Sequence, residues 1–115
     1  MTENRLTKNA DYLLCALYSA YLERIKDGES SGDAKLFGES EYIQAKYTPE
    51  LSTLDIDEAA RELHSSGMLK CLFGDDELCQ CGILPNGIIY MEHRFGDKLD
   101  SLAQRIAAIR SAFIS

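Results

Sequence analysis

The C-terminal third of the sequence carries the pattern that most limits the fold. From residue 99 onward, apolar residues recur at steps of three and four, the heptad spacing of a helix that packs along one face (Leu99, Leu102, Ile106, Ile109 and Phe113). Upstream, Ile88, Met91 and Phe95 continue this face, and Pro85 suits the first turn of a helix. We therefore expect one long helix over residues 85–113, which can kink or break at Gly96, where the heptad spacing shifts.

An apolar face of this length needs a surface to pack against. The preceding residues predict enough helices to fill a core of their own, so we expect the C-terminal helix to pair with a second copy of the chain. The predicted homodimer interface consists of Ile88, Met91, Phe95, Leu99, Leu102, Ile106, Ile109 and Phe113. The alternative is that this face packs on the first helix of its own chain.

The charge balance limits the classes of partner. The 115 residues include 12 Lys+Arg and 19 Asp+Glu, a net charge of −7, and an acidic chain repels nucleic acid and anionic lipid at long range. No apolar run is long enough for a membrane span, and the first residues lack the apolar segment of a secretory signal. Four scattered cysteines fit a reducing compartment, so we expect a single cytoplasmic domain over residues 1–115.

Residues 7–84 predict the core of this domain. A first helix begins after Thr7 and ends at Gly28, and its wide apolar stripe indicates a central position. A short strand is expected over 35–37. A second helix, capped by Ser40, is expected to run to about residue 47, and a third, capped by Thr53 or Asp55, to about 66. Two apolar runs over 68–84 then predict a hairpin, whose turn over residues 74–77 is longer than the tightest two-residue kind.

This order resembles the winged-helix families, nearest in style to the PadR and MarR types of bacterial regulator. The resemblance covers about residues 7–113 and rests on the segment ELHSSGML at 62–69, the hairpin, and the segment ILPNGIIYME at 83–92. Leu84 departs from it, because those families usually place a helix-capping threonine there. The resemblance implies an α+β, winged helix-turn-helix-like fold in which the hairpin at 68–84 is the wing and residues 85–113 form a dimerisation helix.

In such a fold the third helix would read DNA, through Asp57, Glu58, Arg61, His64 and Ser65. Its outward residues include four acids and one base, and the hairpin tip adds three more acids. Acids cannot neutralise phosphates, so we expect weak or absent DNA binding. The function we expect is a non-catalytic regulatory or adaptor role through protein contacts, and the alternative is a PadR/MarR-like DNA-binding transcriptional regulator.

Three cysteines lie on the predicted hairpin: Cys71, Cys79 and Cys81. If the turn has an odd length, their odd positions place them on one apolar face, where free cysteine packs as a small hydrophobic residue. A thiol or metal sensor is a further alternative, but the spacing of Cys79 and Cys81 is too short for the usual zinc knuckle. We expect no metal and no cofactor. Because the sequence also lacks a recognisable nucleophile, phosphate-binding or metalloprotease motif, we expect no enzyme activity.

Overall fold

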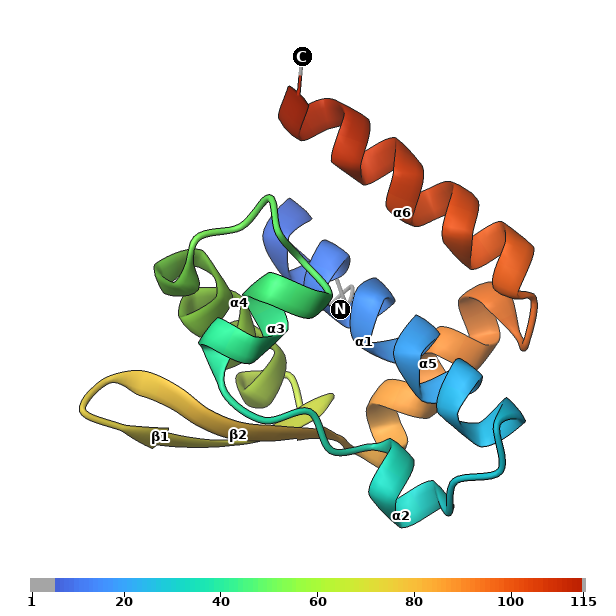
Figure 1. Ribbon diagram of the computed structural model, residues 1–115, viewed down its shortest axis with the longest axis horizontal. Coiled ribbons are helices and arrows are strands. Elements are labelled where there is room, and N and C mark those ends of the chain that lie inside the picture. The colour runs from blue at the N-terminus through green and yellow to red at the C-terminus, as the bar shows by residue number, and fades with distance from the viewer. Residues whose placement is uncertain (1–5, 115) are drawn as a thin grey trace, which may run out of the picture.

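The computed structural model describes residues 6–114 and arranges its elements around one central helix (Figure 1). In chain order these are α1 (Lys8–Lys26), α2 (Ser31–Ala34), α3 (Ser40–Lys46), α4 (Thr53–Ser65), β1 (Leu69–Gly74), β2 (Glu77–Ile83), α5 (Pro85–Phe95) and α6 (Leu99–Ile114). Within the described residues there are six helices and one two-stranded antiparallel sheet, which confirms the α+β class. None of these helices combines the length and the apolar character that a membrane crossing requires.

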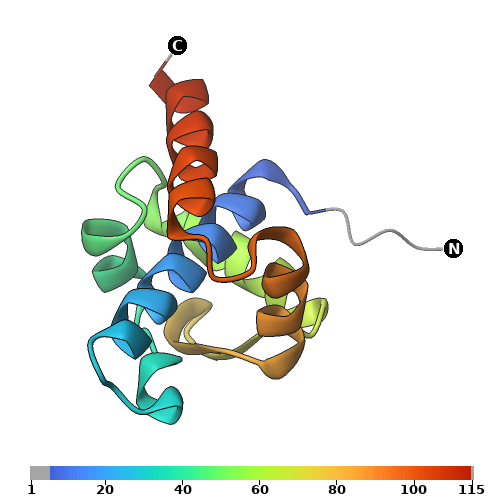
Figure 2. The same ribbon diagram turned by 90° about the vertical axis from the view of Figure 1, so that its right-hand side faces the viewer.

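Helix α1 lies at the centre, as its wide apolar stripe predicts. The Thr7 hydroxyl caps it by accepting a hydrogen bond from the backbone N–H of Ala10, and Gly28 follows its end at a φ of 95°. Every residue from Ala10 to Tyr18 is buried. On one side α1 packs against α4, and on the other against α5 and α6 (Figure 1). In the view turned by 90°, α6 rises above the rest of the molecule and the hairpin lies below it (Figure 2).

Helices α3 and α4 form where the sequence predicts them, but both begin at a different cap. Glu39, not Ser40, is the N-cap of α3, and it makes no side-chain hydrogen bond there. Ser52 caps α4 in place of the predicted Thr53 or Asp55. Its hydroxyl accepts a hydrogen bond from the Asp55 backbone N–H, and the Asp55 carboxylate accepts one from the Ser52 backbone N–H, which completes a capping box. The predicted buried face of α4 is confirmed: Ile56, Ala59, Ala60 and Leu63.

The hairpin turn is tighter than the sequence analysis expects. Gly74 pairs with Glu77, so only Asp75 and Asp76 lie between the strands. Both have positive φ, 52° and 67°, which is the backbone of a type I′ turn. Aspartate tolerates this left-handed region because its short side chain can form local hydrogen bonds, so the predicted longer turn is wrong.

A bulge in the hairpin moves one cysteine to the opposite face. Leu72 pairs with Gln80, but the next residue of β1, Phe73, pairs with Leu78, which leaves Cys79 as the extra residue. Leu78 is therefore buried, and Cys79 is exposed. The prediction that the hairpin cysteines share one apolar face is confirmed for Cys71 and Cys81 and is wrong for Cys79.

The predicted strand over residues 35–37 is reduced to a single bridge, between Leu36 and Gly82. Backbone hydrogen bonds on either side hold this segment against β2: Phe37 N–H donates to the Cys81 carbonyl at 3.0 Å, and Ile83 N–H donates to that of Lys35 at 3.1 Å. The segment therefore lies along the free edge of β2, and it connects α2 to α3.

The C-terminal region is two helices rather than one long helix. Helix α5 begins with Pro85 in its first turn, and its N-cap Leu84 provides no side-chain hydrogen bond. It ends at Gly96, whose φ of 61° is unfavourable for residues with a side chain. The Gly96 carbonyl accepts a hydrogen bond from the Tyr18 hydroxyl at 2.7 Å, which fixes the break to α1. Because of the break, α6 turns back along α1 (Figure 1).

Candidate functional site

The exposed side of α4 differs from the predicted recognition surface at one residue. Leu54, Glu58, Arg61 and Ser65 repeat at helical spacing and are exposed. Asp57 is buried, with 5% of its surface accessible. Its carboxylate accepts a hydrogen bond from the Leu78 backbone N–H at 3.0 Å, which ties α4 to the start of β2. Asp57 therefore holds the hairpin in place and is not part of a surface that could contact DNA.

Arg61, the base of α4, is directed to the hairpin tip. Its guanidinium donates to the Asp76 backbone carbonyl at 2.9 Å and lies 3.9 Å from the Asp76 carboxylate. The guanidinium carbon is 4.1 Å from the centre of the Phe73 ring. These contacts hold the positive charge of Arg61 within the chain's own acidic hairpin.

His64 and Ser65, the other two residues predicted for recognition, are both exposed at the end of α4. The His64 ring nitrogen Nδ1 accepts a hydrogen bond from the Cys71 backbone N–H at 3.2 Å, and this fixes the ring beside β1. Within residues 6–114, Ser65 has no comparable contact that would orient it. Three of the five predicted recognition residues, Asp57, Arg61 and His64, therefore contact the hairpin. The other two, Glu58 and Ser65, are exposed on α4.

Carboxylates gather in a surface hollow between the hairpin tip and the start of α3. The hollow, here called the acidic hollow, has a volume of about 340 Å³. Its lining consists of Glu39, Ser40, Glu41, Gly74, Asp75, Glu77, Leu78 and Cys79. Four of these residues are acids and none is basic, so the hollow can attract a cationic group and repels phosphate.

The cysteines do not assemble into a reactive or metal-binding cluster. Burial raises the pKa of the Cys71 thiol to about 11 and that of Cys81 to about 12, so both stay protonated at neutral pH. Cys15 in α1 is also buried, and burial raises the pKa of its thiol to about 12. Cys79 is exposed alone in the acidic hollow. Among residues 6–114, no three His, Cys, Asp or Glu side chains are grouped as metal ligands.

The residues predicted for a dimer interface pack inside the chain. Met91, Leu102 and Ile109 are buried in the core. The other five are half-buried against it: Ile88, Phe95, Leu99, Ile106 and Phe113. The apolar face that motivated the dimer is therefore covered by the chain's own core, largely by α1, which is the alternative that the sequence left open. Homodimer formation remains a prediction, and this face no longer supports it.

A buried carboxylate holds the C-terminal helices to α1. Asp11 accepts a hydrogen bond from Arg94 of α5 at 2.6 Å and one from Arg105 of α6 at 2.8 Å. Burial by itself would raise the pKa of Asp11, but the hydrogen bonds and charges of the two arginines outweigh it, so the pKa lies below its ordinary value. In the sequence, Asp11 lies within the apolar stripe of the first helix. An acid in such a position indicates a buried residue that needs a charged partner.

A second polar network joins the far end of α6 to α1 and to the connection between α3 and α4. Arg110 donates to the Tyr12 hydroxyl at 2.9 Å and to the Tyr47 carbonyl at 3.3 Å, and it lies 3.5 Å from the Glu50 carboxylate. The Tyr12 hydroxyl also donates to Glu50. Burial and the Glu50 carboxylate raise the pKa of Tyr12 to about 12.

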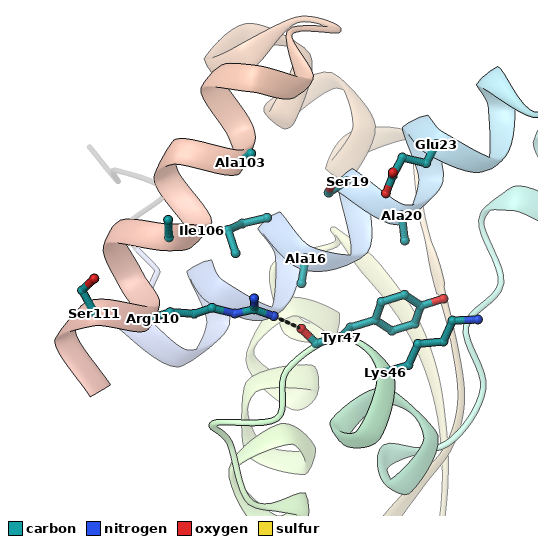
Figure 3. Close-up of a pocket in the computed structure, with 11 residues that line it drawn as sticks. Ala16, Ser19, Ala20, Glu23, Lys46, Tyr47, Ala103, Ile106, Arg110 and Ser111 are labelled. Carbon is teal, nitrogen blue, oxygen red and sulfur yellow. Dashed lines mark hydrogen bonds between the residues drawn. The ribbon is translucent and has the colours of Figure 1, made fainter. Parts of the chain in front are cut away.

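Next to this network, α1, α6 and the end of α3 line an open groove with a volume of about 440 Å³ (Figure 3). Its lining consists of Ala16, Ser19, Ala20, Glu23, Lys46, Tyr47, Ala103, Ile106, Ala107, Arg110 and Ser111. Alanine and serine predominate on the two long helices, while the charged groups come from Glu23, Lys46 and Arg110. We call this feature the α1–α6 groove.

Comparison of the chain with protein-family models, with curated proteins and with solved structures gives no match. The functional interpretation of the molecule therefore rests on its own geometry and charge.

Proposed function

We propose that this chain is a winged-helix-like, non-catalytic regulatory or adaptor module that binds a basic segment of a protein partner in the acidic hollow. The order of elements supports the winged-helix interpretation: α1, the short α2, a segment bridged to β2 at Leu36, then α3, α4 and the hairpin. In that interpretation α4 has the place of the recognition helix, and the β1–β2 hairpin has that of the wing.

The charge of the hollow is the observation that carries the proposal. Glu39 and Glu41 approach it from α3, while Asp75 and Glu77 approach it from the hairpin. Lysine or arginine side chains of a partner could each meet more than one carboxylate there. Such charge complementarity favours fast and selective association.

The same charges disfavour the alternative of a DNA-binding regulator. A recognition helix and wing must approach phosphates closely, and DNA-binding proteins use arginine and lysine for those contacts. Arg61 is the base that α4 could offer, and it already contacts Asp76 and Phe73 of the hairpin. DNA binding would require Arg61 to leave these contacts and to act against the surrounding acids.

Binding measurements on the full chain test the proposal. Fluorescence anisotropy at about 150 mM salt, where surface charges are screened over about 8 Å, would compare a labelled arginine-rich peptide with a labelled random-sequence DNA duplex. We expect the peptide to bind and the duplex to remain free. Sub-micromolar binding of the duplex that Arg61→Ala abolishes would support the DNA-binding regulator instead.

A matched pair of variants separates the acidic hollow from general attraction by an acidic chain. The triple variant Glu41→Gln, Asp75→Asn, Glu77→Gln removes three charges from the hollow. The control variant Glu29→Gln, Glu92→Gln, Asp97→Asn removes the same number of exposed charges elsewhere. We expect only the first variant to lose peptide binding, and equal losses in both would contradict a specific site.

A further inference from the structure

The floor of the acidic hollow contains a hydroxyl group that the described part of the chain does not use. Of the residues that line the hollow, Ser40 and Leu78 are buried, while the others, which include the four acids, are exposed. Ser40 is only 3% exposed, yet within residues 6–114 its side chain makes no hydrogen bond. The two buried residues therefore form the floor of the hollow, and the acids form its rim.

The Ser40 hydroxyl faces the hollow and is not sealed inside the protein. In the described part of the chain, Thr48 has the one buried side-chain oxygen that lacks both a hydrogen-bond partner and access to solvent. The Ser40 oxygen also lacks a partner but keeps some access, and the space that Ser40 borders is the hollow. A polar group that is nearly buried and unpaired in this way is a point at which a ligand can bind.

The start of α3 explains why this hydroxyl is unused. Glu39 is the N-cap of α3, so Ser40 lies one position too late for its hydroxyl to cap the helix. Glu39 makes no side-chain hydrogen bond at the cap either, and its carboxylate lies on the rim of the hollow. The beginning of α3 therefore presents a free hydroxyl and the flanking carboxylates of Glu39 and Glu41 to the same space.

The hollow thus offers oxygen acceptors on three sides. Two acids of α3 form one wall, two acids of the hairpin form the other, and the Ser40 hydroxyl lies on the floor between them. Helix α3 packs against β2, which brings the two walls together. Because the lining holds no basic residue, a ligand must supply both the positive charge and the hydrogen-bond donors.

We propose that one lysine of the partner's basic segment anchors it, with the lysine ammonium inside the acidic hollow and donating a hydrogen bond to the Ser40 hydroxyl. This inference rests on the proposed function and adds which side chain of the partner is recognised. An ammonium is compact and its three N–H groups point in different directions, so it can meet the hydroxyl and a carboxylate on each wall at once. The donors of a guanidinium lie in one plane and suit a carboxylate approached from the side, so arginine leaves the Ser40 hydroxyl without a direct contact.

Two labelled peptides of otherwise identical sequence, with either lysine or arginine at every basic position, test the anchor on the full chain. In fluorescence anisotropy we expect the lysine peptide to bind about fivefold more tightly than the arginine peptide. Ser40→Ala should weaken binding of the lysine peptide about fivefold and that of the arginine peptide less than about twofold. Ser101→Ala, at an exposed serine of α6, is the control and should change neither affinity. Circular dichroism confirms that both variants are folded.

The exposed thiol of the hollow reports whether the lysine peptide occupies it. Cys79 is exposed there, whereas Cys15, Cys71 and Cys81 are buried, so iodoacetamide should alkylate Cys79 first. At about ten times its dissociation constant, the lysine peptide should slow this alkylation about tenfold. Mass spectrometry of the intact, unmodified chain measures the rate, so this test does not depend on any variant.

The outcomes separate the lysine anchor from the proposed function. If both peptides bind equally and Ser40→Ala changes neither affinity, the hollow still binds a basic segment, but the lysine anchor is wrong. If neither peptide binds at about 100 µM, the proposed function and the anchor both fail. Binding of the lysine peptide that leaves the alkylation of Cys79 unchanged would place the binding site outside the hollow and would overturn the anchor as well.

Discussion

The hairpin end and the α6 end of the molecule differ in how their surface charges are arranged. At the hairpin end, carboxylates of α3 and of the turn gather without bases in the acidic hollow. At the α6 end, each charged residue between 101 and 113 is paired with a residue outside α6. The first surface remains charged toward the solvent, while the second is rich in alanine over residues 101–113 and has one exposed acid, Asp100, at the start of α6.

This difference indicates two different kinds of contact. A surface of one charge sign repels its own copy and suits a partner of the opposite sign, whereas a surface of small residues with few unpaired charges suits close packing of helices. The buried core between the two ends is shared, because α1 contacts α4 on one side and α6 on the other. Changes at either end can therefore be compared against the same scaffold.

The largest expected effect concerns the attachment of α6. Leu102 is fully buried against the chain's own core, so Leu102→Ala should lower the free energy of unfolding by about 3 kcal/mol. Urea unfolding followed by circular dichroism measures this loss, and it should not vary with protein concentration. Ile89→Ala, at a residue that is 51% exposed, is the control and should change stability by about 0.5 kcal/mol or less. A loss for Leu102→Ala that grows on dilution would instead mean that this face packs against a second copy.

An intermediate effect is expected at Asp11, which joins α1 to both C-terminal helices. Asp11→Asn removes charge-assisted hydrogen bonds to Arg94 and Arg105 and should cost about 2 kcal/mol at pH 7. Because the pKa of Asp11 is lowered in the folded state, the ionised carboxylate stabilises the fold above the unfolded-state value of 3.8. That contribution is lost as pH falls through the lower folded-state pKa.

Unfolding at pH 7 and at about pH 3 therefore distinguishes Asp11 from an ordinary surface acid. The difference in stability between the unmodified chain and Asp11→Asn should shrink at the lower pH. Glu29→Gln, at an exposed loop position, should have little effect at either pH. A difference that stays constant over this pH range would show that the ionised state of Asp11 does not hold the helices together.

The sequence predicts those parts of the fold that depend on local pattern. Apolar spacing and capping place α1 and α4 within a residue or two, since the buried face of α4 recurs at helical intervals. Gly96 marks the break between α5 and α6 because a glycine can adopt the positive φ found there. The heptad pattern predicts α6 itself, but it does not tell whether the covering surface belongs to the same chain or to another.

Apolar spacing and capping do not predict features that depend on contacts between residues far apart in the sequence. The bulge that exposes Cys79 is a property of how β1 and β2 align, and the alignment is not encoded in either strand alone. Asp57 has the sequence spacing of a surface residue, but it is buried, and its carboxylate accepts a hydrogen bond from the Leu78 backbone N–H. The acidic hollow likewise combines α3 with the hairpin turn, more than thirty residues apart in sequence.

The smallest expected effect separates the hairpin end from the α6 end most directly. Arg61 is exposed, with 45% of its side chain accessible, so its hydrogen bond and ring contact should contribute only about 0.5 kcal/mol to global stability. Arg61→Ala should nevertheless loosen the turn locally, because the Asp76 carbonyl loses its partner. Hydrogen exchange of the Glu77 backbone N–H should become faster, while amides of α6 such as that of Ile109 keep their protection. Arg61→Lys is a useful companion, since it keeps the charge and lacks the planar guanidinium that lies over Phe73. If Arg61→Ala slows exchange at the turn or changes protection equally in α6, the two ends are not independent, and the contrast in charge between them would not imply separate contacts.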